Sequence, residues 1–310
     1  MFYGLGSGFL WAAQTVLLSV VLGAGIFTQS AQAIYLAPFV GAFLNDAVSG
    51  VWLLLFRKSS RRFRGNSVLH ALRTGPGKWL LLSGLFGGPL GMSAYVLSLS
   101  YVGPADTAVI SALYPVLGSI FARLFLKEDL TRKQLAGILL SAAGVIGMVG
   151  LPRGGGHPVY YVFSLACALF WGLEAVVSSH AMKQGNVPFE TALQIRQWTS
   201  VLCYAALFLP LLRAWGFTGQ VLTDRVLLLF VLTALLETGS YLLYYKSISV
   251  TGAPKAMSLN ITYIIWSIFL SILIFKKLPT AFEAVSIGVL LAGVLMVVKF
   301  GRKKPPPGAL

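Results

Sequence analysis

The chain has 310 residues, of which 57% are hydrophobic and only 11% are charged, and its mean hydropathy is +0.80. Soluble domains carry about 25% charged residues. The 24 basic and 9 acidic side chains of this sequence therefore cannot cover the surface of a soluble protein of 33.3 kDa. This composition excludes a soluble enzyme, a coiled coil and a disordered protein, and it predicts that lipid surrounds most of the chain.

The net charge of +15 does not indicate nucleic-acid binding, because the basic residues gather in short segments between long apolar runs. Cytoplasmic loops of membrane proteins have this pattern. The three histidines are scattered, and the sequence contains no CxxC or HExxH motif. We therefore expect no metal site, no cofactor and no nucleic-acid partner.

A membrane-spanning helix needs roughly 20 consecutive apolar residues. Ten such runs occur, and they are too long and too uniformly apolar for the strands of a barrel. The sequence therefore predicts an all-α integral membrane protein. Its ten predicted spans lie near residues 5–27, 35–56, 78–100, 105–126, 134–151, 159–182, 190–213, 225–248, 255–275 and 281–300.

The distribution of lysine and arginine predicts the orientation of these spans. With the N-terminus in the cytoplasm, 17 basic residues fall in inside segments and 5 in outside segments. Basic residues favour the cytoplasmic side, so we expect both termini inside, with residues 301–310 as a cytoplasmic tail. A bacterial inner (plasma) membrane is the expected location, and the bilayer is an expected partner.

The two halves of the chain resemble each other. Residues 101–108 and 113–115 align with residues 250–257 and 262–264 at an offset of 149. Each half then holds five spans, the first within 1–151 and the second within 152–300. An odd number of spans per repeat reverses the orientation of the second half, which is the inverted-repeat architecture of secondary transporters.

The ten spans in two five-helix repeats, the Gly-Val pairs at 144–145 and 293–294, and Leu-Tyr-Pro at 113–115 resemble the EamA type of the drug/metabolite transporter superfamily. Ile264 departs from this pattern, because it stands where the second repeat would have the proline. The resemblance covers nearly the whole chain. It implies a transporter of a small metabolite that works by alternating access, in a superfamily whose substrates include amino acids and choline.

A weaker resemblance is to bacterial choline permeases. It rests on the Ala-Pro-Phe run at 37–39, the Asn-Asp pair at 45–46, and Trp171 with Glu174. The resemblance implies a choline-like quaternary amine or another organic cation as the substrate.

Ionisable side chains at membrane depth are costly and mark functional sites. Asp46 and Arg196 occupy equivalent positions in the two halves. We expect them to form either a structural ion pair or a gating and coupling pair. If they pair, Glu174 and Glu237 remain as uncompensated carboxylates. These would hold protons or await a cation, which favours a cationic or zwitterionic substrate and allows proton coupling.

Aromatic residues accompany these carboxylates at helical spacing. Trp171 lies one turn from Glu174, and Trp11 matches it one turn from Gln14. A tryptophan face beside a carboxylate can bind an organic cation. A hydrogen-bonded packing seam between helices is the structural alternative. The predicted substrate-binding residues are Trp11, Gln14, Tyr95, Trp171, Glu174, Glu237, Tyr241, Tyr244, Asn260 and Tyr263.

Other functions remain open at this point. The first alternative is an exporter of amino acids or of mixed amphipathic drugs. A membrane-embedded enzyme is less favoured, because the longest loop, 57–77, offers only His70 as a base. The inverted repeat argues against a channel, and the sequence allows a monomer or a homodimer. Two overlapping GxxxG spacings, at 84–88 and 87–91, predict close helix packing.

Overall fold

The computed structural model describes residues 1–59, 68–102, 107, 110–149, 158–275 and 280–300. Within these ranges the regular secondary structure is helical, without strands, which confirms the predicted all-helical class. The predicted tail at 301–310 lies outside the described residues.

Five helical stretches are long and apolar enough to cross a membrane. They are α1 (Phe2–Leu22), α3 (Ala31–Ser59), the stretch Gly75–Ser98, α10 (Tyr161–Gln184) and α14 (Val226–Thr251). The third consists of α5 (Gly75–Leu85), the π-helical η2 (Phe86–Leu90) and α6 (Gly91–Val102). The π-helical turn contains Pro89, which cannot donate a backbone hydrogen bond and therefore disturbs the regular ladder.

A sixth candidate is bent. It runs through α11 (Phe189–Cys203), η4 (Tyr204–Phe208) and α12 (Leu209–Leu211), and α13 (Trp215–Thr223) then turns away by 118°. The remaining helices are not among these candidate spans. They are α2 (Gly25–Thr28), α4 (Val68–Arg73), α8 (Tyr114–Leu126), α9 (Arg132–Val149), η3 (Pro158–Tyr160), α15 (Ala253–Asn260), α16 (Tyr263–Phe275) and α17 (Ala281–Phe300).

The prediction of one continuous helix over 255–275 is wrong, because α15 and α16 are separated at Ile261 and Thr262. The Thr262 hydroxyl donates to the Leu259 carbonyl at 2.7 Å, which is the kind of local bond that competes with helical hydrogen bonding. Likewise α8 begins only at Tyr114, and Pro115 occupies its first turn, where a missing N–H costs nothing. The total of ten spans therefore stays a prediction.

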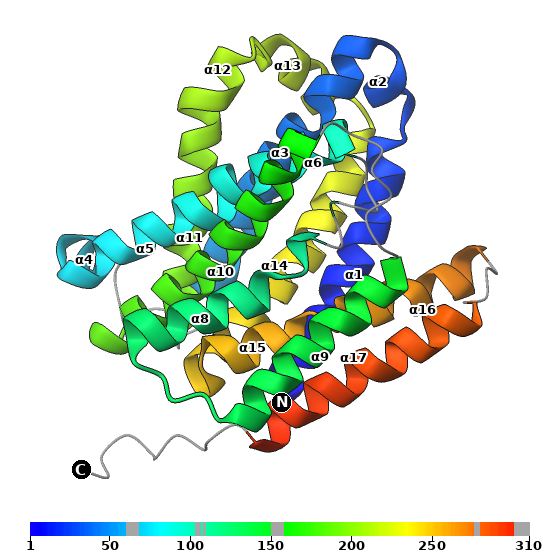
Figure 1. Ribbon diagram of the computed structural model, residues 1–310. Helices are drawn as coiled ribbons and strands as arrows, with labels where there is room; N and C mark the ends of the chain where they lie inside the picture. Colours follow the sequence, from blue (N-terminus) through cyan, green and yellow to red (C-terminus); the bar gives the residue numbers. More distant parts are fainter. Residues whose placement is uncertain (60–67, 103–106, 108–109, 150–157, 276–279, 301–310) are drawn as a thin grey trace.

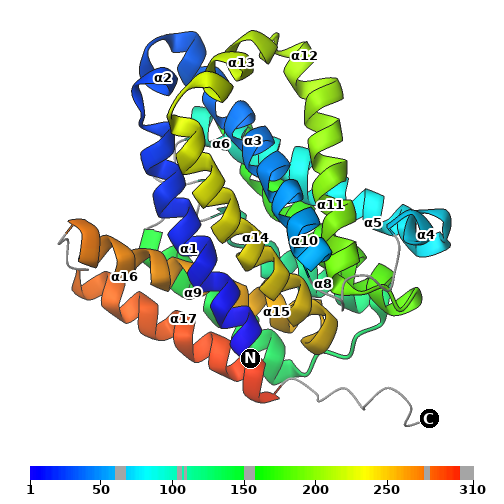
Figure 2. The same cartoon turned by 180° about the vertical axis from the view of Figure 1, so that it is seen from behind.

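The helices of the two halves pack mainly against each other. Helix α14 lies between α1 and α3, while α10 packs against α5, α6 and α8 (Figure 1). Helices α9 and α17 pack along each other on one side, and α2 and α13 lie at one end of the bundle. The start of α1 and the end of α17 meet at the opposite end (Figure 2). This arrangement buries the polar side chains of α3, α10, α11 and α14 in the middle of the molecule.

Candidate functional site

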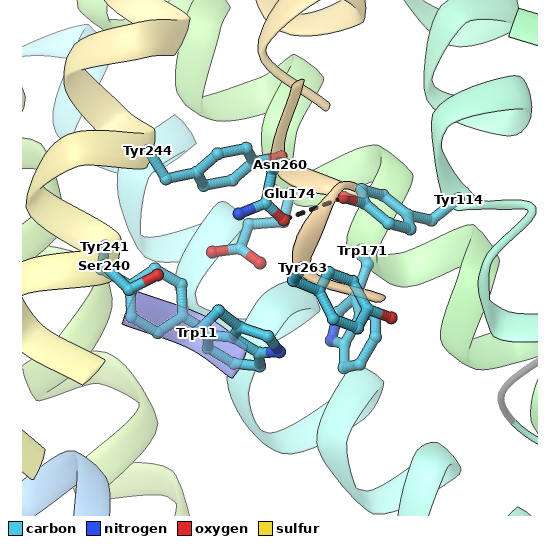
Figure 3. Close-up of a pocket in the computed structure, with 9 residues that line it drawn as sticks. All are labelled: Trp11, Tyr114, Trp171, Glu174, Ser240, Tyr241, Tyr244, Asn260 and Tyr263. Atoms are coloured by element: carbon cyan, nitrogen blue, oxygen red, sulfur yellow. Dashed lines mark hydrogen bonds between the residues drawn. The ribbon is translucent and has the colours of Figure 1, made fainter. Parts of the chain in front are cut away.

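Two neighbouring cavities occupy the middle of the bundle. The first, here called the aromatic cavity, has a volume of about 50 Å³. Its lining consists of tryptophan and tyrosine rings with one carboxylate, one amide and one serine (Figure 3): Trp11, Tyr114, Trp171, Glu174, Ser240, Tyr241, Tyr244, Asn260 and Tyr263. Seven of the ten predicted substrate-binding residues are among them, and Tyr114 and Ser240 are additional.

The rings of the aromatic cavity hold one another in place. Trp11 meets Tyr241 edge to face with centroids 5.5 Å apart, and Trp171 meets Tyr114 in the same way at 6.2 Å. Such edge-to-face pairs are favourable aromatic arrangements. The Tyr114 hydroxyl donates to Asn260 Oδ1 at 3.0 Å, which ties the first turn of α8 to the end of α15. The cavity therefore has walls from both halves of the chain.

The second cavity, here called the larger cavity, has a volume of about 180 Å³. It shares Trp11, Trp171 and Tyr263 with the aromatic cavity, so these three rings lie between the two spaces. Successive turns of α1 up to Leu22 line it, so it extends from the middle of α1 toward α2. The other three predicted substrate-binding residues line only this cavity: Gln14, Tyr95 and Glu237. The predicted pair of Asp46 and Arg196 lines it too.

Arg196 is the centre of a buried polar cluster, and only 1% of the residue is exposed. Its Nη1 donates to Asp46 Oδ1 at 3.1 Å, which is the ion pair expected from the repeat. Its Nη2 donates to the Tyr241 hydroxyl at 2.8 Å, and the guanidinium lies 4.4 Å from the Tyr241 ring centroid. Buried charges require such pairing, since transferring an isolated ion out of water is very costly.

The expectation that Glu174 remains uncompensated once Arg196 pairs with Asp46 is wrong. Arg196 Nε donates to Glu174 Oε1 at 3.1 Å, and the Tyr245 hydroxyl donates to the same oxygen at 3.0 Å. One guanidinium therefore serves two carboxylates. The reason is geometric: the planar guanidinium has five N–H donors, so it can reach acids on two different helices at once.

Glu237 is the buried carboxylate that does not pair with Arg196. It is 3% exposed and accepts a hydrogen bond from the Asn45 side-chain amide, whose oxygen in turn accepts one from Thr233 at 2.9 Å. Over the ranges that the structure describes, the ion pairs are Lys183 with Glu128 and Arg196 with its two acids. Glu237 has no basic partner in this set.

Sequence reasoning missed several residues that hold the cluster together. Gln197 Nε2 donates to Asp46 Oδ1 at 2.8 Å, and the Ser200 hydroxyl donates to Asp46 Oδ2 at 2.5 Å. Ser200 lies one helical turn after Arg196, so a search for polar residues on the Arg196 face would have found it. Asn45 adjoins Asp46 in sequence, but its side chain donates a hydrogen bond to Glu237. This partner follows only from the packing of α14 against α3.

Comparisons with known proteins agree with this architecture. The model of the EamA-like transporter family matches residues 1–150 and 159–299. Protein LicB of Haemophilus influenzae is 29% identical over 311 aligned residues, which cover 97% of this chain and 98% of LicB. The aromatic amino acid exporter YddG of Ancylobacter novellus is 30% identical, over only 27% of this chain and 31% of its own length.

A solved crystal structure shares the fold, with a TM-score of 0.73 at 21% identity, over 97% of this chain and 96% of that one. The apolar helices and the family match together identify an integral membrane protein of the drug/metabolite transporter superfamily. The chain belongs to the EamA-like transporter family.

Proposed function

We propose that this transporter moves a choline-like quaternary amine, or a closely related organic cation, across a bacterial plasma membrane by alternating access. The aromatic cavity carries this proposal. It encloses the buried Glu174 carboxylate among the rings of two tryptophans and four tyrosines (Figure 3). Aromatic faces attract quaternary ammonium groups through the ring quadrupole, and a carboxylate supplies the counter-charge.

The pairing of Glu174 with Arg196 does not remove the preference for a cation. With both acids ionised, two carboxylates share one guanidinium, so the cluster of Asp46, Glu174 and Arg196 carries one net negative charge. A cation in the aromatic cavity would balance that charge. An anion there would meet Glu174 without a basic residue among the cavity-lining side chains.

The architecture that we propose for transport is ten spans in two inverted repeats, with both termini in the cytoplasm. Two observations support it. The turns at residues 112–113 and 261–262 precede Tyr114 and Tyr263, and they occur at the 149-residue offset of the sequence repeat. Phe2 and Phe300 also begin and end helices at one end of the bundle, as an even number of crossings requires.

The two cavities suggest how access alternates. Trp11, Trp171 and Tyr263 separate them, so rotation or displacement of these rings would open a path from one cavity to the other. The Asp46–Arg196 pair joins α3 to α11 beside this barrier. In our proposal the pair acts as a gate that rearranges between the two transport states.

The substrate class can be tested by thermal unfolding of the detergent-purified protein with choline, tetramethylammonium and the uncharged carbon isostere of choline. A ligand at 100 times its dissociation constant stabilises the folded state by about 2.7 kcal/mol. We expect the two cations to raise the melting temperature and the isostere to leave it unchanged. Equal stabilisation by the isostere would contradict a cation site.

Replacing Trp171 with alanine should weaken choline binding about tenfold, because it removes one aromatic face from the cation. Titration calorimetry would measure the dissociation constant. Trp79→Ala is the matched control, since Trp79 lies at an exposed position outside both cavities. Wild-type affinity in Trp171→Ala would exclude this ring from the site.

We further propose that transport is coupled to protons and that Glu237 carries the coupling proton. Its hydrogen bond from Asn45 is compatible with both a carboxylate and a carboxylic acid, because either form keeps an acceptor oxygen. Its side chain lines the larger cavity, beside Asp46 and Arg196 of the proposed gate. Protonation there would change the charge next to the gate and so favour one of its states.

Glu237→Gln should therefore bind and exchange choline but lose accumulation driven by a pH gradient. One unit of pH across the membrane is worth about 1.4 kcal/mol, which supports a tenfold concentration ratio for one proton per substrate. Proteoliposomes with gradients of both polarities would measure uptake of labelled choline. Glu128→Gln is the control, and undiminished gradient-driven accumulation by Glu237→Gln would exclude this assignment.

Export of amino acids is the second candidate function, because two relatives with shorter matches are named as amino-acid exporters. An amino acid would need a basic partner for its carboxylate, and Arg196 lines the larger cavity. The same thermal-unfolding experiment separates the two candidates. Stabilisation by aromatic amino acids but not by quaternary amines would favour export of amino acids.

A further inference from the structure

The glycines of the third span contact the helices that carry the proposed site. Gly84, Gly87, Gly88 and Gly91 form two overlapping GxxxG spacings across α5, η2 and α6. A β-carbon at Gly87 would overlap the Glu174 carboxylate, and one at Gly91 would lie 2.7 Å from Trp171 Cδ1. The pair Gly87 and Gly91 therefore forms a groove, here called the glycine groove, that receives the two site residues of α10.

The other two glycines receive α11. A β-carbon at Gly84 would lie 2.8 Å from Thr199 Cβ, and one at Gly88 would overlap the Ser200 hydroxyl. Ser200 in turn donates to Asp46. The two GxxxG spacings thus face two different helices, and both helices present residues of the buried cluster at the point of contact.

The Glu174 carboxylate is held from several sides at once. Arg196 and Tyr245 both donate to Oε1, and the carboxylate lies in the space that a side chain at position 87 would fill. Glu174 also lines the aromatic cavity, where Trp171 lies one turn away on the same helix. How far the negative charge projects into that cavity therefore depends on how deeply the glutamate enters the glycine groove.

We propose that Gly87 is a specificity-determining residue, because the missing side chain lets Glu174 withdraw into the wall and so sets the headgroup size that the aromatic cavity accepts. Gly91 is a positioning residue, because its missing side chain leaves room for the Trp171 ring. This inference rests on the proposed binding of an organic cation between Trp171 and Glu174. Gly87 lies in η2, so a backbone segment that contacts no substrate would influence which cations the aromatic cavity accepts.

The test compares the affinities for tetramethylammonium and tetraethylammonium, measured by titration calorimetry on the full-length protein. Gly87→Ala should weaken binding of tetramethylammonium about tenfold or more, because a displaced charge and a narrowed cavity each cost affinity. It should weaken binding of tetraethylammonium even more, since the larger headgroup needs the lost space. Gly216→Ala is the matched control, because a β-carbon at Gly216 meets no atom within 4 Å.

A compensating substitution separates specificity from simple packing. Glu174→Asp shortens the side chain by one carbon–carbon bond, about 1.5 Å, and should shift the preference toward tetraethylammonium. The double variant with Gly87→Ala should recover affinity for tetramethylammonium relative to Gly87→Ala alone, because the shorter acid leaves room for the new methyl group. If Gly87→Ala does not fold, the double variant compared with Glu174→Asp carries the test, because the shorter acid leaves room for the new methyl group.

The outcomes are distinct. An unchanged ratio of the two affinities in Glu174→Asp, or no recovery in a folded double variant, would overturn the inference. If the wild-type protein binds neither cation, the proposed function itself fails. If it binds them and Gly87→Ala behaves like Gly216→Ala, only the role of the glycine groove is excluded.

Discussion

Replacing Glu174 with glutamine should weaken binding of the cationic substrate by about a hundredfold or more, which corresponds to about 2.7 kcal/mol. Glu174 is 5% exposed, and a charge of opposite sign inside such a poorly solvated cavity interacts far more strongly than in water. Glutamine has nearly the same shape, so the lost charge is the main change. Titration calorimetry with choline would measure the effect.

The fold should tolerate this substitution. The glutamine side-chain oxygen can still accept the hydrogen bonds from Arg196 Nε and the Tyr245 hydroxyl, so neither donor is left unpaired. Glu190→Gln, in the first turn of α11, is the control for loss of an acidic residue outside the site. Wild-type affinity for choline in Glu174→Gln would show that the counter-charge lies elsewhere.

Replacing Arg196 with glutamine should destabilise the protein by about 3–5 kcal/mol, because removing one partner of a buried ion pair leaves uncompensated charge in the interior. Here the loss affects two carboxylates, Asp46 and Glu174, and also removes the donor to the Tyr241 hydroxyl. We expect a markedly lower melting temperature in detergent. Arg225→Gln, at an exposed position, should leave the melting temperature nearly unchanged.

A rescue experiment tests the cause of this destabilisation. Adding Asp46→Asn and Glu174→Gln to Arg196→Gln removes both orphaned charges, so the triple variant should recover much of the lost stability. A triple variant as unstable as Arg196→Gln would show that the arginine stabilises the fold mainly by packing. An Arg196→Gln protein as stable as wild type would contradict the central role of the ion pairs.

Much of the helical architecture could be predicted because lipid imposes a local requirement. A stretch of about 20 residues must be apolar and must satisfy its own backbone hydrogen bonds, so α1, α3, α10 and α14 are visible in the sequence. Breaks inside an apolar stretch were harder to locate. The interruption before Tyr263 involves no proline or glycine, and the Thr262 side chain bonds to the backbone there.

The candidate site was predictable only in part, because the sequence indicates contacts within one helix but not contacts between helices. Trp171 and Glu174 lie one turn apart, so their shared face follows from helical periodicity alone. The sharing of Arg196 by two acids does not follow, because Asp46, Glu174 and Arg196 lie on three different helices. Whether one guanidinium reaches both carboxylates depends on how closely those helices approach.

The sequence by itself determined that this protein is helical and embedded in a membrane, because hydropathy and charge act within single segments. It also identified the ionisable residues Asp46, Glu174, Arg196 and Glu237 that the interior must accommodate. The repeat also predicted the pairing of Asp46 with Arg196. Only the tertiary structure decided that Arg196 compensates Glu174 as well, while Glu237 has Asn45 as its partner. The physical reason is distance, since ion pairs and hydrogen bonds form only between groups that packing brings within a few ångströms. The glycines of the third span permit that approach for α10 and α11.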